Sequence, residues 1–326
     1  MNTTGKKMIL LTAVLLFFLA SFAQQKDAIV VAQDGSGNFE TVQQAFDAIP
    51  ENNSKPITIF VKEGIYKEKL YLDSEKSFVT LIGQDRFKTI LTYNDHSGKT
   101  TSGGDTINTV TSCSFLIDGN NFTARNITFR NNAGLDAGQA VAVEVNGDKA
   151  SFTNCRFIGD QDVLFTRNEH SREYYKDCYI EGTTDFIFGA ATAWFEECRI
   201  HSKKNSHVTA ASTPEDHPFG YVFYDCELTG DTGITNADLG RPWRPYASVT
   251  FMHCYIGQHI KAAGWSNWHH TDSYKTARFS EYEDGGPGAN SKKRIFWSHQ
   301  LTNEQAKEYT MENVLQGWVP PGSKCK

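Results

Sequence analysis

The sequence predicts an all-β protein built as a parallel β-helix, with a short capping helix near the N-terminus and a helix near the C-terminus. The first observation behind this prediction is a repeated unit of an aromatic residue, two polar positions, Cys, one variable position and an apolar residue. Five copies begin at Phe152, Tyr175, Phe195, Phe223 and Phe251. Repeats at intervals of this size are typical of solenoids in which each repeat forms one coil.

The second observation is the local pattern from Ile57 onward, where short runs rich in Val, Ile, Thr, Phe and Tyr alternate with Gly, Asn and Asp. Such runs are typical of strands separated by turns. Within the repeat, the aromatic residue and the Cys have opposite parity, so we expect a bend between them. A weaker copy of the unit begins at Phe122.

Residues 1–23 have the features of a signal peptide. Lys6 and Lys7 precede an apolar run from Met8 to Phe22, and small residues at 21 and 23 fit a cleavage site before Gln24. The run is short for a bilayer span, which needs about 20 residues. We expect residues 24–326 to form a single exported domain, periplasmic or extracellular, that leaves the membrane after signal removal. A retained anchor is the alternative.

Local patterns predict the elements at the two ends of the domain. A short strand is expected over 28–32, and Thr41 begins the capping-box pattern Thr-Val-Gln-Gln. Pro50 ends the helix that follows. A second capping box begins at Thr302 and predicts a helix over about 303–315, which would cover the C-terminal end of the solenoid.

Seven Cys in an exported chain would normally suggest a disulfide framework. Five of them occupy the repeated unit, so equivalent thiols should stack about 4.8 Å apart in successive coils. Because free Cys behaves as a small buried hydrophobe, we expect a buried ladder of thiols, with disulfides between neighbouring coils as the alternative. The Cys spacing matches no zinc site, and we expect no metal.

The formal net charge of −6 argues against a nucleic-acid partner, because nucleic-acid-binding proteins carry a basic surface. An anionic polymer would have to be met by a local basic or neutral patch, since the whole chain repels it. We expect the mature protein to act as a monomer.

Two aspartates, Asp162 and Asp185, each begin a short apolar run. A carboxylate at the edge of a buried strand is costly to ionise, so it often serves a function. Gln139 precedes Asp162 by the same interval that separates the two aspartates, and equal steps would stack all three residues on one face. Two adjacent carboxylates cannot both ionise easily, so one should hold a proton near neutral pH.

Arg241 follows Asp185 by the same interval that separates Phe195 from Phe251, which is two coils of the repeat. We therefore expect its guanidinium to lie beside one Asp and keep it ionised. Trp243 offers an aromatic face for a sugar ring, and Trp265 and Trp268 are candidates for the same role. The alternative is a hydrogen-bonded ladder of turn residues without catalytic function.

Five motifs follow one another along the chain: Gly64-Ile-Tyr-Lys-Glu, Gln139-Ala-Val-Ala-Val, Gly159-Asp-Gln-Asp-Val-Leu-Phe, Asp185-Phe-Ile-Phe-Gly and Leu239-Gly-Arg-Pro-Trp. In these motifs, and over about 29–318, the sequence resembles the pectin methylesterase (pectinesterase) family. The resemblance implies a right-handed parallel β-helix. It also implies hydrolysis of the methyl esters of homogalacturonan (pectin) to free carboxylate and methanol, without a cofactor.

The resemblance further implies a role for each site residue. Asp185 would be the nucleophile, and Asp162 the acid for departing methanol and then the base for water. Gln139 and Gln161 would stabilise the oxyanion. Arg241 would position Asp185. The implied substrate contacts are Phe188, Arg241, Trp243 and Trp265.

Other classes of protein would require features that differ from those of this sequence. A pectin-binding solenoid without catalysis would not need both aspartates and Arg241. A β-helical lyase would want a calcium site and a basic catalytic residue, and a glycosidase further Asp pairs. A related thioesterase acting on lipid-like substrates is the remaining alternative, against which the Trp-rich region favours sugar. The sequence contains no Gly-x-Ser-x-Gly motif, which would indicate a serine hydrolase.

Overall fold

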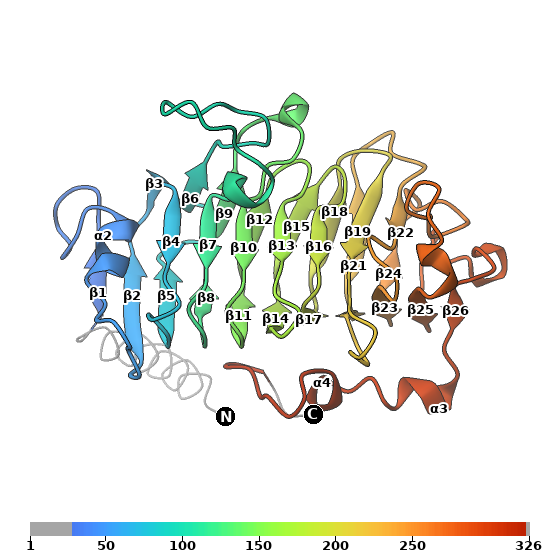
Figure 1. The fold of residues 1–326 in the computed structure, drawn as a ribbon. Coiled ribbons are helices and arrows are strands. Elements are labelled where there is room, and N and C mark those ends of the chain that lie inside the picture. Colours follow the sequence, from blue (N-terminus) through green and yellow to red (C-terminus); the bar gives the residue numbers. More distant parts are fainter. Residues whose placement is uncertain (1–27, 324–326) are drawn as a thin grey trace, which may run out of the picture.

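The computed structural model describes residues 28–323, and in it the chain winds into a parallel β-helix with three sheets (Figure 1). Neighbouring strands within each sheet pair in parallel, one strand per coil. We number the sheets in the order in which a coil visits them. The predicted fold class is confirmed.

Sheet 1 has eleven strands: β1 (Ile29–Val31), β2 (Ile57–Val61), β5 (Val79–Gly83), β8 (Thr123–Arg125), β11 (Ala150–Thr153), β14 (Arg172–Lys176), β17 (Thr192–Glu196), β20 (Tyr221–Tyr224), β23 (Ser248–Met252), β25 (Arg278–Tyr282) and β26 (His299–Gln300). Sheet 2 has eight: β3 (Gly64–Lys67), β6 (Thr89–Tyr93), β9 (Thr128–Asn131), β12 (Arg156–Ile158), β15 (Tyr179–Gly182), β18 (Arg199–Ser202), β21 (Glu227–Gly230) and β24 (Tyr255–Ile256). Sheet 3 has seven: β4 (Leu70–Leu72), β7 (Phe115–Ile117), β10 (Val143–Val145), β13 (Leu164–Thr166), β16 (Ile187–Gly189), β19 (His207–Ala211) and β22 (Asp238–Gly240). The helices are α2 (Val42–Asp47), α3 (Asn303–Ala306) and α4 (Met311–Val314), with single turns η1 (Val110–Ser112), η2 (Leu135–Ala137), η3 (Ser273–Lys275) and η4 (Ser291–Lys293).

Each repeated unit bends between sheet 1 and sheet 2 at the residue immediately before its Cys. These residues have φ between 52° and 56°, in the left-handed region that Asn and Asp tolerate better than most: Asn154, Asp177, Glu197, Asp225 and His253. The expected bend is therefore confirmed. The weaker copy was misaligned by two positions, because Phe152 pairs with Ala124 and not with Phe122.

The interior of the solenoid is a stack of equivalent side chains from successive coils. The rings of Phe195, Phe223 and Phe251 lie face to face, with centroids 4.4 and 4.5 Å apart. The five repeat Cys are free thiols and at most 2% exposed. They donate to backbone carbonyls, as Cys198 does to Tyr175 at 3.4 Å. The predicted thiol ladder is confirmed.

Helix α2 lies at the N-terminal end of the solenoid. The capping box is formed as predicted, with the Thr41 side chain accepting from the backbone N–H of Gln44. The buried face of the helix includes Val42 and Phe46, and the Phe46 ring stacks on Phe115 at 5.4 Å. This helix therefore closes the first coils of the core.

The C-terminal segment differs from the prediction of one helix over 303–315 at the end of the solenoid. It forms two short helices, α3 and α4, separated by residues 307–310. Figure 1 shows both running below the strands of sheet 1 and not across the last coil. Val314 and Leu315 pack with Trp194 and Val222 in one apolar cluster. Sheet 1 carries apolar side chains on its outer face, so the segment covers this side.

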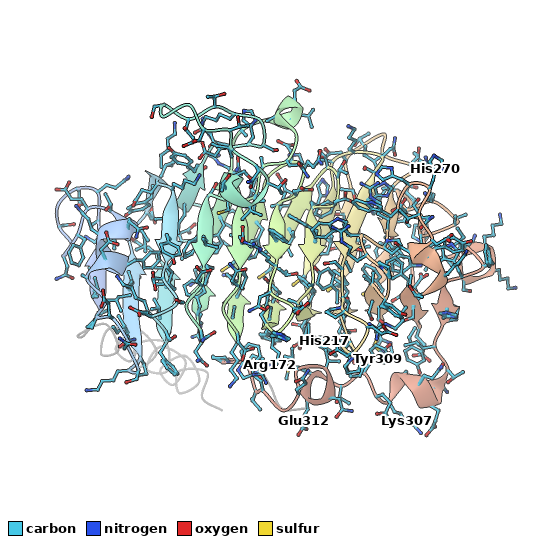
Figure 2. The ribbon with its side chains drawn as sticks, in the orientation of Figure 1. Arg172, His217, His270, Lys307, Tyr309 and Glu312 are labelled. Atoms are coloured by element: carbon cyan, nitrogen blue, oxygen red, sulfur yellow. The ribbon has the colours of Figure 1, made fainter. Side chains whose placement is uncertain are left out.

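Aromatic contacts hold the same segment along the solenoid. Tyr309 packs edge-on against Phe219, with ring centroids 5.1 Å apart. Figure 2 shows Tyr309 on the same side of the molecule as His217, with Lys307 and Glu312 on the outer edge of the segment.

No helix within residues 28–323 is both long and apolar enough to cross a bilayer. The predicted signal peptide, residues 1–23, lies outside the described residues.

Candidate active site

The two aspartates occupy equivalent positions in adjacent coils of sheet 3. Leu164 pairs with Ile187, and each Asp lies two positions before its member of that pair. Both have left-handed backbones, with φ of 63° for Asp162 and 49° for Asp185. Residues held in sparsely populated backbone regions often mark functional sites. The stacking expected from the interval between them is present.

Arg241 forms a bidentate ion pair with Asp185. Its Nε donates to Oδ1 at 3.0 Å and its Nη2 donates to Oδ2 at 2.6 Å. The two side chains are only 13% and 7% exposed. In a buried setting, this fork-to-carboxylate geometry fixes the orientation of the carboxylate and favours its charged form.

The equal-interval prediction of this contact was wrong about the register of Arg241. Gly240 pairs with Thr209, which pairs with Ile187, so Arg241 lies at the level of Phe188 and not of Asp185. The guanidinium reaches Asp185 across one intervening coil. At that level the intervening residue is Ala210, which leaves room for a long side chain.

Asp162 is 4% exposed, and its surroundings differ from those of Asp185. Burial and the negative charge of Asp185 raise the pKa of Asp162 to about 8. Hydrogen bonds from Gln139 and Gln161 and the charge of Arg241 act in the opposite direction but do not cancel the rise. One carboxyl is thus an ion-paired anion and its neighbour a neutral acid at pH 7.

Gln139 and Gln161 lie together beside Asp162, but not in the predicted register. Gln139 forms an isolated parallel bridge with Gln161, one coil later. The position equivalent to Asp162 is therefore taken by Ala140, and the step between these coils is one position shorter than predicted. Hydrogen bonds from both amides to the Asp162 carboxyl nevertheless lower its pKa.

A cleft of ≈ 220 Å³ opens above the two carboxyls on the outer face of sheet 3. Its lining comprises Thr109, Val110, Gln139, Asp162, Phe165, Asp185, Phe188, Ala210, Trp243 and Trp268. Phe188 and Trp243, which were predicted to contact substrate, both line this cleft. The Trp268 ring lies 4.0 Å from the guanidinium carbon of Arg241, which connects the aromatic wall to the ion pair.

Trp265 was predicted to contact substrate, and the structure contradicts this. Its side chain is 1% exposed and packs in the core, 4.5 Å from the Phe279 ring. Its Nε1 donates to Glu281 Oε1 at 3.2 Å. Trp268, in the same loop, is the one that reaches the cleft.

Four contributors to the cleft were not predicted from the sequence: Thr109, Val110, Phe165 and Ala210. Phe165 stacks on Phe188 at 4.2 Å, and its place in the motif that contains Asp162 was the available signal. Val110 comes from the long β6–β7 connection, which Figure 1 shows as the loop above the sheets. No local pattern indicated that this loop returns to the site.

The polar column continues beyond Asp185. His207 pairs with Asp238 in the next coils, and its Nδ1 lies 2.8 Å from Asp238 Oδ1. The other oxygen of Asp238 accepts from Lys261 Nζ at 2.8 Å and from Ser266 Oγ at 2.7 Å. Asp238 is 1% exposed and is the first residue of β22, and Arg241 follows directly after this strand. The cluster therefore fixes the strand that positions Arg241.

Within residues 28–323, no three His, Cys, Asp or Glu side chains lie close enough together to hold a metal ion.

A parallel β-helix with a carboxylic acid pair in an open aromatic cleft belongs to the class of solenoid enzymes that act on polysaccharides. Similarity to known proteins identifies the family within this class. A sequence model of the family Pectinesterase matches residues 28–318. The chain belongs to the pectinesterase family.

Individual relatives agree with this assignment. Pectinesterase 31 of Arabidopsis thaliana is 40% identical over 290 residues, covering 87% of this chain and 91% of the relative. Pectin methylesterase from carrot has 31% sequence identity and a TM-score of 0.80, with 89% and 93% of the two chains covered. A pectin methylesterase in complex with a hexasaccharide has a TM-score of 0.79 at 28% identity, covering 89% of this chain and 97% of its own. The fold is thus the right-handed parallel β-helix of these enzymes.

The chain spans 53% of two other relatives from Arabidopsis thaliana, each named a probable pectinesterase/pectinesterase inhibitor. The similarity to these two proteins therefore concerns about half of their length.

Proposed function

We propose that this protein hydrolyses the methyl esters of methyl-esterified homogalacturonan, releasing methanol and leaving free galacturonate carboxylates. The observation that carries the proposal is the contrast between two adjacent carboxyls. Asp185 is held as an anion by a bidentate Arg241, while burial keeps Asp162 protonated at neutral pH. Nucleophilic attack and protonation of a leaving group require this pair of states.

In the first half-reaction, an Asp185 oxygen attacks the carbonyl carbon of the methyl ester. The carbonyl oxygen becomes an oxyanion, to which the amides of Gln139 and Gln161 donate hydrogen bonds; one such donor is typically worth about 3 kcal/mol. Asp162 then gives its proton to the departing methoxy oxygen. Methanol leaves, and the substrate carbonyl remains joined to Asp185 as an anhydride.

In the second half-reaction, Asp162 is a carboxylate and accepts a proton from water as the water oxygen attacks the substrate carbonyl. The bond to Asp185 breaks, and Asp185 regains its negative charge beside Arg241. Asp162 has regained its proton, so both carboxyls return to their starting states. The cycle consumes one ester and one water and forms one methanol and one acid.

The cleft suits a sugar polymer. Trp243 and Phe188 lie with ring centroids 6.0 Å apart, and Trp268 lies 6.4 Å from Trp243. Flat apolar ring faces of this kind pack against the carbon faces of sugars, and an open cleft admits the interior of a chain. The substrate contacts are thus assigned to Phe188, Trp243, Trp268 and Arg241.

We further propose that residues 24–326 act as one exported domain, periplasmic or extracellular, and as a monomer. The continuous β-helix over the described residues supports a single domain. Export rests on the predicted signal peptide and on the location of polymeric pectin outside cells.

The decisive experiment measures methanol release from highly methyl-esterified pectin in the presence of a chelator. The wild type is compared with Asp185→Asn and with the matched control Asp160→Asn. Asp160 lies two positions before Asp162, where it pairs with Lys203 at 2.8 Å, and it does not line the cleft.

We expect Asp185→Asn to lower kcat by about 10³-fold or more, because the nucleophile acts as a unit with its neighbours. Asp160→Asn should keep activity within a few fold of the wild type. A folded wild-type protein that releases no methanol would refute the proposal, and an unsaturated product that depends on calcium would indicate a lyase. Retained binding without hydrolysis would indicate a non-catalytic solenoid.

A further inference from the structure

A second groove lies on the outer face of sheet 2 and shares no residue with the catalytic cleft. Its volume is ≈ 560 Å³. The floor comes from β12, β15 and β18, and one wall comes from the turn between β5 and β6, which carries Arg86 and Phe87. Nothing in the reaction described above uses this groove.

Cations and aromatic rings alternate along the groove. The guanidinium carbons of Arg86 and Arg156 lie 4.6 and 5.1 Å from the centroid of the Phe87 ring. Arg156 also lies 5.6 Å from the centroid of the Tyr179 ring. Phe87 is 55% exposed, which is unusual for a large apolar side chain and leaves its ring available to a ligand.

The two stacked arginines lack carboxylate partners. Among the described residues, neither Arg86 nor Arg156 forms an ion pair; Arg86 donates to the side chain of Asn154, and Arg156 donates to Thr128 Oγ1 at 3.3 Å. Each guanidinium has five N–H donors, so most of them stay available for an anion. By contrast Arg199, at the edge of the groove, is already bound through two nitrogens to Glu227.

The groove also contains two acidic side chains, Asp177 and Glu197, and Glu197 is paired with Lys176 at 2.7 Å. Because Arg199 is paired with Glu227, the groove arginines without an ion pair among the described residues are Arg86 and Arg156. These two guanidiniums offer an anionic polymer a local point of attachment on a protein whose net charge of −6 repels it overall.

We propose that this groove is a second carbohydrate site, which binds a de-esterified segment of homogalacturonan. A linear polyuronate offers one carboxylate on each sugar and a carbon face on each ring. Arg86 and Arg156 would bind carboxylates of nearby sugars on either side of Phe87, and the Phe87 and Tyr179 rings would pack against the sugar faces. Methyl esterification removes the charge, so the groove prefers the product over the substrate.

The identity of the ligand rests on the proposed function, since the polyuronate is the product of that reaction. When the groove binds the de-esterified part of a polymer, the esterified part of the same polymer stays near the catalytic cleft. Two linked contacts raise the effective concentration of the polymer at the protein. The groove therefore acts on long, partly de-esterified chains and has no effect on short esters.

The test uses calorimetric titration of the intact protein with a fully de-esterified oligogalacturonate of about ten sugars at low ionic strength. The variants are Arg156→Gln and Phe87→Ala, and the control is Arg130→Gln. Arg130 also lies on sheet 2, on β9, but outside the groove, so its substitution changes the net charge equally. A Trp243→Ala variant measures the share of binding that belongs to the catalytic cleft.

We expect Arg156→Gln and Phe87→Ala each to weaken this binding about tenfold or more, and Arg130→Gln to change it less than twofold. Thermal unfolding confirms that each variant is folded, and methanol release from a short methyl-esterified oligomer should be unchanged in both groove variants. Binding within twofold of the wild type in both groove variants overturns the proposal, as does its complete loss in Trp243→Ala alone. Because the titration involves no hydrolysis, its result is independent of whether the chain releases methanol.

Discussion

Replacing Asp162 by Asn should stabilise the protein while abolishing its activity. The folded state surrounds this carboxyl with apolar side chains and the charge of Asp185, which together raise its pKa to about 8 from an ordinary value of 3.8. In the unfolded chain, the carboxyl ionises freely in water. Asn keeps nearly the same shape and does not titrate, so the substitution removes the free-energy cost of keeping a protonated carboxyl in the folded state at neutral pH.

The magnitude follows from the linkage between proton binding and folding. Between pH 4 and pH 8 the folded state holds a proton at Asp162 that the unfolded state has released, so rising pH favours unfolding. This contributes about 1.4 kcal/mol per pH unit. The stability gained by Asp162→Asn should therefore be small near pH 4, grow through this window and level off above pH 8 at about 6 kcal/mol.

The assay is equilibrium unfolding in urea at pH 5, 6, 7 and 8 for the wild type and Asp162→Asn. The thermal midpoint gives a second measure, in which about 1 kcal/mol corresponds to roughly 1–2 °C for a chain of this size. Asp160→Asn is the control; it removes a carboxylate that is ion-paired with Lys203, so it should lower stability. A difference between wild type and Asp162→Asn that stays constant from pH 5 to pH 8 would refute the buried neutral acid.

Other consequences of the site can be measured directly. Since Asp162 must be protonated to release methanol, kcat/KM should fall about tenfold per unit as pH rises above about 8; a rate that stays constant to pH 10 would contradict this role. Arg241→Gln leaves Asp185 buried without its cation and should lower kcat by about 10²–10³-fold, with partial recovery in Arg241→Lys, as measured by methanol release. Trp265→Ala should lower the free energy of unfolding by about 3–5 kcal/mol, while Trp268→Ala should change it by less than about 1 kcal/mol and raise KM; equal effects on stability would contradict their different burial. Asp238→Asn should lower stability by about 3 kcal/mol and reduce kcat by loosening the strand that directly precedes Arg241, and an unchanged kcat would show that the cluster has no positioning role.

The fold was predictable because its determinants repeat. The aromatic residue and the Cys recur in successive coils, and the residue between them bends the chain at the same point each time. The C-terminal segment was predicted less well, because its position depends on the outer face of sheet 1. Nothing in the sequence of residues 303–315 indicates that this segment packs against Trp194 and Val222 on sheet 1.

The sequence predicted which residues form the site more reliably than it predicted how these residues align between coils. Equal steps along the chain placed Asp162 and Asp185 correctly, since the paired residues Leu164 and Ile187 are separated by the same interval. The same arithmetic failed for Gln139, where the step is one position shorter, and for Arg241, where the coils differ in length. Trp265 and Trp268 could not be told apart, because a loop without periodicity gives no indication of which ring points inward.

The solenoid explains how so small a set of residues becomes a catalyst. Parallel pairing in adjacent coils brings Asp162 and Asp185 side by side, although a full coil separates them in the chain. Their backbones are fixed by ladder hydrogen bonds: the Asp162 N–H donates to Thr184 at 3.1 Å, and the Asp185 N–H donates to His207 at 2.8 Å. Mutual repulsion and burial then divide their roles, and Arg241 decides which carboxyl carries the charge. Because these interactions form as the protein folds, little reorganisation remains for the reaction itself. The stability given up at Asp162 is what maintains a neutral acid beside an anion.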